Sequence, residues 1–241
     1  MNDFQKQEEM RGHYDETYGV NLKVETHIDL LKSSFQQYRI AKVLGIHTPG
    51  KDEEVLDLGC AQGTFCFALA PLCRQITGVD YSSKTIDVCN ILLQKSPYSN
   101  IRFVCADAQH TGLKSESYDT IISADLFEHL YPEVSEKVLD ECKRLLKKGG
   151  KLVLWTPHRG HILEILKNNN IILKRGIGHV DYKSMDRLLE GLLKRDFTIH
   201  KAYYAESHIP VFRVLERLLI PVLPLFRRRI AILAEKVAAE I

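Results

Sequence analysis

The feature that most constrains the fold of this chain is the segment from Val55 to Phe65, which reads VLDLGCAQGTF. An apolar run around Asp57 leads into two glycines, Gly59 and Gly63, and then into a second apolar run. This order is typical of a buried strand that turns tightly into a helix. The glycines permit close approach of the backbone to a ligand, and Asp57 brings an acceptor to the same edge. The segment therefore predicts a turn that binds a cofactor.

The spacing of the two glycines limits which cofactor the turn can hold. It is GxxxG, whereas dinucleotide-binding turns carry GxGxxG and phosphate-binding loops end in Lys-Ser or Lys-Thr. The turn lacks the features that hold a pyrophosphate, and a ligand made of an amino acid and a nucleoside fits better. The string resembles motif I of the class I S-adenosylmethionine-dependent methyltransferases.

Strand and helix patterns alternate regularly from residue 54 to about residue 156. We expect strands at 54–58, 75–80, 101–106, 118–123 and 151–156, and helices at 64–73, 82–95 and 133–147. Such alternation requires crossovers and predicts an α/β, Rossmann-like, doubly wound and mostly parallel sheet with helices on both faces. The resemblance implies seven strands. Ligands of such sheets bind at the carboxyl ends of the strands.

Acidic residues follow the second and third of these strands. Asp80 ends the second strand, about twenty residues beyond the glycine-rich turn, where a carboxylate can accept both hydroxyls of a ribose. In the resembled family, the acidic residue that matches Asp107 accepts a hydrogen bond from the adenine amino group of the cofactor. The segment at the fourth strand passes beneath the methionine part of the cofactor. The resemblance therefore implies an S-adenosylmethionine site built from Asp57, Gly59, Cys60, Ala61, Gly63, Phe65, Asp80, Tyr81, Asp107, Ala108 and Ala124.

The end of the fourth strand carries the candidates for chemistry. Methyl transfer from a sulfonium is an in-line displacement, so the protein mainly positions the acceptor and removes its proton. Proton removal requires a base, or a metal ion that lowers the pKa of the acceptor hydroxyl. Asp125, Glu128 and His129 lie at i, i+3 and i+4, which places them on one side of a helical turn. Two interpretations stay open. In the first, Asp125 caps the following turn, Glu128 is solvated and His129 is a lone base. In the second, these residues form a metal site. The catalytic candidates are His129, Glu128 and His158.

The metal interpretation rests on a second resemblance. In polyprenyl-quinone O-methyltransferases and small-RNA 3′-end methyltransferases, an ExxEH string binds a divalent ion with help from a histidine after a TPN segment. This chain has DLFEH, in which Asp125 replaces the first Glu, and WTPH, in which His158 replaces the Asn. The resemblance implies a site for Mg²⁺, Mn²⁺ or Zn²⁺ at Asp125, Glu128, His129 and His179.

The chain divides into three parts. Residues 1–50 predict two helices, at 3–18 and 28–44, that either pack on the domain or cover the ligand as a lid. Residues 51–205 form the cofactor-binding core. Residues 206–241 contain an amphipathic segment at 209–229, closed by three arginines, and then a strand at 230–236 that we expect at the sheet edge. The segment is either a packed or dimer-forming helix, or a peripheral membrane contact.

Composition limits which partners this chain can bind and in which cell compartment we expect it. The formal net charge is +2, which argues against DNA, and the chain lacks the broad basic face with interleaved aromatics of an RNA binder. Six cysteines without a CxxC pair indicate reduced thiols. No apolar signal segment is present at the N-terminus, so we expect a cytoplasmic protein, monomeric or homodimeric, with the tail at a membrane as the peripheral alternative.

Together these features predict an S-adenosylmethionine-dependent methyltransferase that acts on oxygen of a small, lipophilic or glycosylated acceptor. Two other functions remain. An RNA 3′-end methyltransferase shares the metal-like string, and a protein of this fold can bind the cofactor as a scaffold or regulator without catalysis.

Overall fold

The computed structural model describes residues 1–18, 25–168, 179–208 and 210–237. Its centre is a seven-stranded sheet in the order β3-β2-β1-β4-β5-β7-β6. The strands are β1 Glu54–Leu58, β2 Gln75–Asp80, β3 Ile101–Cys105, β4 Tyr118–Ala124, β5 Leu146–Pro157, β6 Phe197–Ala205 and β7 Arg229–Lys236. Strands β1 to β5 pair in parallel, and β7 is antiparallel to both of its neighbours. The predicted doubly wound, mostly parallel α/β fold is confirmed.

The last strand forms where the sequence predicts it, but its place in the sheet differs from the prediction. β7 lies between β5 and β6, so the edge strand is β6. The reason is burial, because the run from Ile230 to Ala234 is apolar and buried throughout, and such a strand needs neighbours on both sides. Its antiparallel register pairs Arg229 with Pro157, which brings the start of β7 to the carboxyl end of β5.

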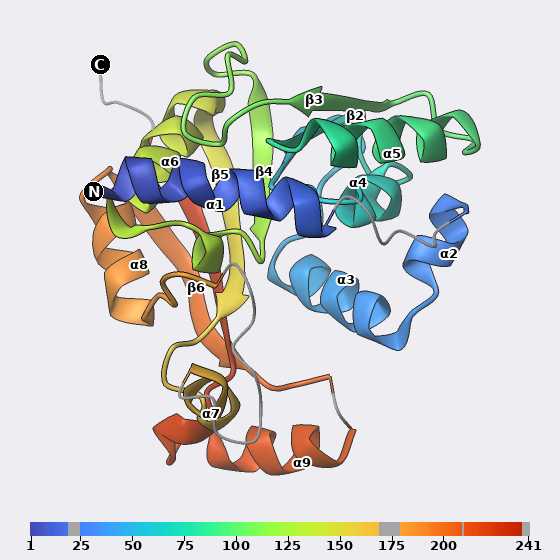
Figure 1. Cartoon of the computed structure of the whole chain (residues 1–241). Coiled ribbons are helices and arrows are strands. Elements are labelled where there is room, and N and C mark those ends of the chain that lie inside the picture. The colour runs from blue at the N-terminus through green and yellow to red at the C-terminus, as the bar shows by residue number, and fades with distance from the viewer. Residues whose placement is uncertain (19–24, 169–178, 209, 238–241) are drawn as a thin grey trace.

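Helices cover both faces of the sheet (Figure 1). They are α1 Asp3–Tyr18, α2 His27–Leu31, α3 Ser34–Ile46, α4 Thr64–Leu69, α5 Ser83–Gln94, α6 Pro132–Leu145, α7 Ile162–Asn168, α8 Met185–Leu193 and α9 Pro210–Leu219. The single helix expected at 28–44 is two helices. Thr26 caps α2 by accepting from the Asp29 amide, and Ser33 caps α3 by accepting from the Gln36 amide. The second cap begins a new helix and so breaks the first.

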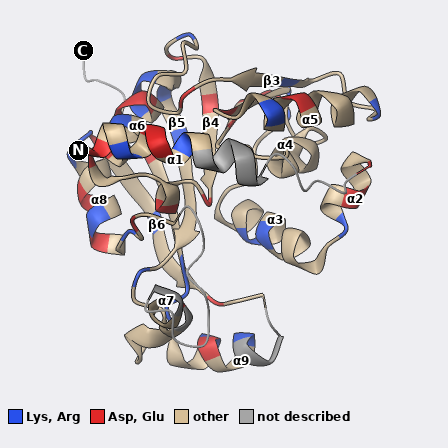
Figure 2. Cartoon of the chain, viewed as in Figure 1, with Lys and Arg blue, Asp and Glu red and all other residues tan. Residues whose placement is uncertain are grey.

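Alternate residues of the central strands enter two apolar layers. Val55 and Val153 pack into the layer under α2, α3, α4 and α5, whereas Leu56 and Leu154 pack into the layer under α6 and α8. Strand side chains point to opposite faces in turn, so a run that is apolar at every position fills both layers. Figure 2 shows that α6 and α8 carry many Lys, Arg, Asp and Glu residues. The carboxyl edge of the sheet is left for a ligand.

The N-terminal helix both packs on the domain and borders that edge. In α1, the Gln7 side chain donates to the His129 carbonyl at 3.0 Å and accepts from the Tyr131 amide at 3.0 Å. These bonds tie α1 to the segment that follows β4. Because Gln7, Met10 and Arg11 also line the cavity described below, the packing and lid interpretations of this helix are compatible.

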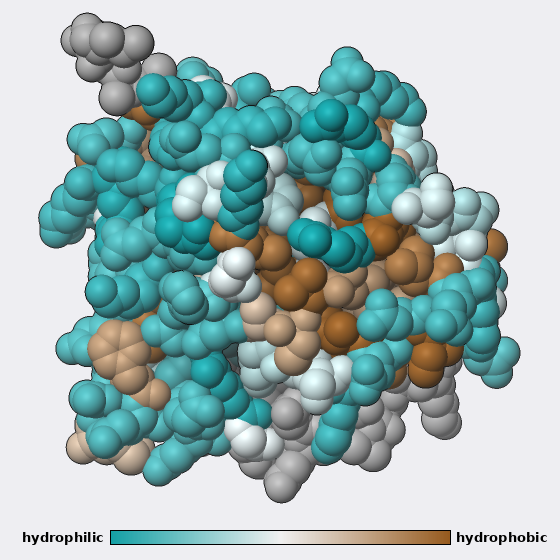
Figure 3. Space-filling model, turned by 90° about the horizontal axis from the view of Figure 1, so that it is seen from above, coloured by the Kyte–Doolittle hydropathy of each residue, from teal (hydrophilic) through white to brown (hydrophobic). Residues whose placement is uncertain are grey.

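The lower end of the molecule in Figure 1 is formed by α7 and α9. Val214, Leu218 and Val222 expose 64%, 69% and 69% of their surface there. The face seen from above in Figure 3 is mostly hydrophilic, with hydrophobic residues gathered near its centre. None of the helices in the described ranges has the length and apolar character needed to span a bilayer.

Candidate active site

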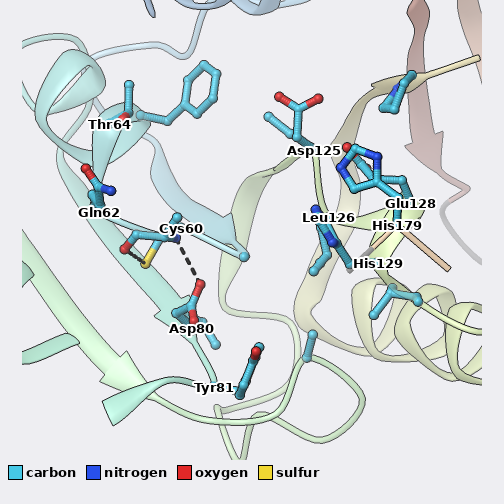
Figure 4. Close-up of a pocket in the computed structure, with 18 of the residues that line it drawn as sticks. Cys60, Gln62, Thr64, Asp80, Tyr81, Asp125, Leu126, Glu128, His129 and His179 are labelled. Atoms are coloured by element: carbon cyan, nitrogen blue, oxygen red, sulfur yellow. Dashed lines mark hydrogen bonds between the residues drawn. The ribbon is translucent and has the colours of Figure 1, made fainter. Parts of the chain in front are cut away.

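A cavity of about 550 Å³ opens at the carboxyl ends of the central strands. Its size is that of ordinary small-molecule pockets. We name its two sides by their strands: the cofactor half comes from the ends of β1, β2 and β3, and the acceptor half from the ends of β4, β5 and β7. Figure 4 shows the halves facing one another, with Cys60, Gln62 and Asp80 on one side and Asp125, Glu128 and His179 on the other.

Two glycines shape the turn of the cofactor half. Gly59 has φ +81° and Gly63 has φ +78°, a region that other residues rarely adopt. A Cβ on Gly59 would stand 3.1 Å from Leu126, and a Cβ on Gly63 would stand 2.9 Å from the Phe103 ring. Gly59 lines the cavity, whereas Gly63 lies behind it and allows the turn to pack on β3. Glycine is therefore required at position 59 beside the ligand cavity and at position 63 for packing of the turn against β3.

Asp80 is fixed by the backbone of the same turn. Its carboxylate accepts from the Ala61 amide at 2.9 Å and from the Ser82 amide at 3.1 Å. Its place at the end of β2, inside the cavity, is the one expected for a ribose-binding carboxylate.

Asp107 also lines the cofactor half, and its partner comes from far away in the sequence. It forms an ion pair with Arg11 of α1 and accepts from the Gln109 amide at 2.9 Å. Arg11 also lies 5.6 Å from the centre of the Tyr81 ring. The N-terminal helix therefore closes the cofactor half beside Asp107 and Tyr81.

Nine of the eleven predicted cofactor residues line the cavity, and Asp57 and Gly63 do not. Asp57 is buried behind the turn, where the Cys66 thiol donates to it at 3.4 Å. Burial raises the pKa of Asp57 to about 7. The structure therefore gives Asp57 a place beneath the turn and away from direct ligand contact.

Asp125 begins the acceptor half in an unusual backbone conformation. Its φ is +61°, and its amide donates to the Trp155 carbonyl at 2.7 Å. The carboxylate lies between two arginines, 2.7 Å from Arg39 and in an ion pair with Arg229. Burial disfavours its charge, but Arg229 and Arg39 outweigh burial and hold the pKa of Asp125 below its ordinary value. Asp125 is thus an ion-pair centre.

Three of the four predicted metal ligands come together beside it. One ligand atom each from Glu128, His129 and His179 lies within 4.8 Å of the others. The two imidazole rings meet edge to face at 4.8 Å between centres. Asp125 is not in this group. The short 3₁₀ turn Phe127–His129 explains the arrangement, since a single tight turn directs its side chains differently from the α-helical turn that we expected.

Two of the three residues, Glu128 and His179, are held by neighbours outside the cavity. Glu128 is buried and accepts from the Thr156 hydroxyl at 2.9 Å. Burial, and then the charge of Asp125, raise the pKa of Glu128 to about 8. His179 lies 2.5 Å from the Tyr182 hydroxyl, measured from its Nδ1. The cluster therefore offers two imidazoles and a carboxyl group with a raised pKa on the side facing the cofactor half.

His158, the third catalytic candidate, lies outside the cavity lining. Its Nδ1 is 3.0 Å from the Arg227 carbonyl, and its ring packs on Tyr204 at 4.9 Å. Burial lowers the pKa of His158. The structure separates this histidine from Glu128 and His129 and gives it a packing position at the end of β5.

Several cavity residues were missed by the sequence analysis. They are polar or charged and come from segments distant from the motifs: Gln7, Arg11, Arg39, Gln62, Thr64, Glu164, Arg228 and Arg229. Gln62 and Thr64 stand inside the glycine-rich turn and could have been named from it. The arginines depend on how α1, α3 and β7 pack, which no local pattern reveals.

Comparisons with known proteins agree with this geometry. Residues 56–154 match the methyltransferase domain family. The ubiquinone biosynthesis O-methyltransferase of Coxiella burnetii is 34% identical over 109 residues, which are 45% of this chain and 45% of that protein. The O-antigen chain terminator bifunctional methyltransferase/kinase of Escherichia coli is 34% identical over 101 residues, which are 41% of this chain and 14% of that protein.

Solved structures extend the likeness to most of the chain. The cyclase SpnF superposes with a TM-score of 0.65 at 17% identity, over 86% of this chain and 84% of that one. At such identity the likeness concerns the fold alone, and a fold hosts different chemistries. Together with the motifs, the family match identifies a class I S-adenosylmethionine-dependent methyltransferase domain in this chain. The chain spans less than half the length of the curated relatives that it matches.

Proposed function

We propose that this chain transfers the methyl group of S-adenosylmethionine to an oxygen of a small acceptor. The observation that carries the proposal is the position of Glu128, His129 and His179, which face the glycine-rich turn across one cavity. The relative from Coxiella burnetii, named as an O-methyltransferase, supports oxygen as the acceptor atom. The relative from Escherichia coli, named as an O-antigen chain terminator, supports a glycosylated acceptor as one possibility within this class.

The residues of the cofactor half fit this cofactor. Asp80 offers carboxylate oxygens to ribose hydroxyls, Asp107 and Ala108 border the adenine position, and Gly59 admits a ligand close to the backbone. Arg39 packs over Phe65 with its Nε buried and without a hydrogen-bond partner among the described residues, so it would hold the methionine carboxylate. When bound, the cofactor supplies a methyl group on a sulfonium.

The residues of the acceptor half then have to orient the acceptor and remove its proton. His129 is the proposed base, because an imidazole changes its charge near neutral pH. Glu128, fixed by Thr156, and His179, beside Tyr182, position the acceptor oxygen against His129. Leu126, Leu130 and Pro157 line the same half and exclude water.

As a second version of this proposal, the side chains of Glu128, His129 and His179 would bind a divalent metal ion. Two imidazoles and one carboxylate suit Mn²⁺ or Zn²⁺ better than Mg²⁺. Bound there, the ion would lower the pKa of the acceptor hydroxyl. The test is transfer by protein treated with chelator, followed by addition of Mg²⁺, Mn²⁺ and Zn²⁺ one at a time. Undiminished transfer by protein without bound metal would leave His129 as the base and remove the metal.

The test of the activity uses the full chain with S-adenosylmethionine tritiated in the methyl group. Cell extract is separated into lipid, small-molecule and RNA fractions, and each is offered as acceptor. We expect label in the lipid or small-molecule fraction, with a methoxy carbon in the product by NMR. Label in RNA would favour the RNA methyltransferase instead. Tight cofactor binding with no label in any fraction would favour a cofactor-binding scaffold.

We also propose that α9 contacts a membrane, which would bring a lipophilic acceptor to the cavity. Val214 and Leu218 are four residues apart on one helical face, and Val222 continues their exposed apolar surface. The test is co-sedimentation with vesicles of neutral and anionic lipid. Replacement of these three residues by Ser should abolish sedimentation, whereas Leu193→Ser, at an exposed leucine in the last turn of α8, should leave it unchanged. Equal sedimentation of all three proteins would remove the membrane contact.

A further inference from the structure

The three consecutive arginines before and at the start of β7 have three different environments. Arg227 packs over the Tyr204 ring at 4.9 Å and donates to the Ile220 carbonyl, and it does not line the cavity. Arg229 lines the cavity and is paired with Asp125. Arg228 also lines the cavity, but its Nη1 is buried without a hydrogen-bond partner among the described residues. Of these three arginines, Arg228 is therefore the one that lines the cavity without a carboxylate partner among the described residues.

Nearby acidic groups do not satisfy Arg228. Glu164 and Glu216 are the acidic residues that act on its charge. Glu164 accepts from the Tyr182 hydroxyl at 2.9 Å, and Glu216 accepts from the Ser207 amide and contacts His161 at 3.3 Å. Both carboxylates thus have other partners, and Arg228 Nη1 has no hydrogen-bond partner among the described residues. A buried donor without an acceptor destabilises the fold, and an arginine without a carboxylate partner is available to an anionic ligand.

The backbone holds Arg228 on the acceptor side of the cavity. Its carbonyl accepts from the His158 amide at 2.8 Å, which fixes it to the end of β5. In the sheet, β4 and β5 lie between this position and β1, whose following turn forms the cofactor half. Arg39, from α3, is the cavity arginine that packs on the glycine-rich segment, through Phe65. Arg228 is therefore placed to contact the acceptor, and Arg39 the cofactor.

From these contacts we infer that the acceptor carries an anionic group, a carboxylate or a phosphate, which Arg228 binds through its guanidinium. This inference rests on the proposed methyl transfer and names the chemical class of its acceptor. A guanidinium is the side chain best suited to either anion, because its planar donors match two oxygens at once. The anion would pair with the Arg228 charge at the cavity lining and place the rest of the acceptor toward His129 in the same cavity.

The test measures binding of three probes to the full chain saturated with S-adenosylhomocysteine: benzoate, phenyl phosphate and the uncharged benzamide. We expect one anionic probe to bind about tenfold or more tightly than benzamide. Arg228→Gln should remove that preference, Arg228→Lys should keep part of it, and the affinity for S-adenosylhomocysteine should stay within about twofold in both variants. The preferred probe tells whether the anion is a carboxylate or a phosphate.

Arg227→Gln is the matched control, since it removes the same charge one residue away and outside the cavity. It should keep the preference for the anionic probe. Equal binding of all three probes to the unmodified chain, or equal loss in both Gln variants, would overturn the inference. A weaker affinity of Arg228→Gln for S-adenosylhomocysteine would also overturn it, by assigning Arg228 to the cofactor.

This test separates the inference from the proposed function. Probe binding does not require methyl transfer, so a chain that binds the anions and never transfers a methyl group would refute the proposed function alone. A chain that methylates an uncharged acceptor and binds the three probes equally would refute the inference alone.

Discussion

The two halves of the cavity are built in different ways. In the cofactor half, the key groups come from one short stretch and the ends of two neighbouring strands, and backbone amides hold them, as Asp80 shows. In the acceptor half, side chains from distant elements hold the key group, as Asp125 shows between Arg39, which reaches over from the cofactor half, and Arg229. A site held by backbone can be recognised from a motif, whereas a site held by distant side chains depends on the complete fold.

The largest effect that we expect comes from the acceptor half. His129→Ala should reduce the rate of methyl transfer by about 100-fold or more, since the proposed base is removed. The measurement is single-turnover transfer of the tritiated methyl group. His200→Ala, at an exposed histidine of the edge strand β6, is the control and should transfer at the unmodified rate. A His129→Ala rate within a few-fold of the unmodified rate would exclude this residue as the base.

The second effect concerns the cofactor half. Asp80→Ala should weaken S-adenosylmethionine binding by roughly 100-fold, because a charged acceptor of two hydroxyls is lost together with its bonds to the turn. Calorimetric titration measures the affinity. Asp87→Ala, at an exposed position of α5, should bind like the unmodified chain. Unchanged affinity of Asp80→Ala would mean that the ribose contact lies elsewhere.

The third effect concerns stability beneath the glycine-rich turn. The pKa of Asp57 is raised to about 7, so the folded chain keeps a proton that the unfolded chain releases near pH 4. The contribution of Asp57 to the free energy of unfolding should therefore fall as pH rises from about 4 to about 7, by a few kcal/mol in order of magnitude.

Asp57→Asn isolates this contribution because its amide does not titrate. In urea unfolding of the chain without ligand, the difference in stability between Asp57→Asn and the unmodified chain should shift in favour of the variant across this pH range. A difference that is constant with pH would show that folding does not raise the pKa of Asp57.

The comparison of the halves also explains what the sequence could predict. The strands from β1 to β5 follow apolar runs with glycine or acidic ends, so they and most cofactor residues could be placed from local pattern alone. The sequence also indicated Glu128 and His129, which belong to the resembled string, and His179, which matches the downstream histidine of the same resemblance. It could not place Asp125 among arginines, because Arg39 and Arg229 reach it only after α3 and β7 have packed.

The position of β7 shows the same limit. Its apolar run predicts a strand, but only the pairing with β5 on one side and β6 on the other decides that it is internal. This pairing brings Arg228 and Arg229, which the sequence pattern placed at the end of the amphipathic segment, into the cavity lining. His158 illustrates the converse, because a residue close to a motif in sequence lies outside the cavity in space.

The most direct test of the division between the halves is single-turnover methyl transfer measured as a function of S-adenosylmethionine concentration. The account predicts that Asp80→Ala regains most of the unmodified rate once the cofactor saturates it, whereas His129→Ala stays slow at every concentration. Recovery of His129→Ala at saturating cofactor, or a slow saturated rate for Asp80→Ala alone, would contradict the assignment of cofactor binding to one half and chemistry to the other.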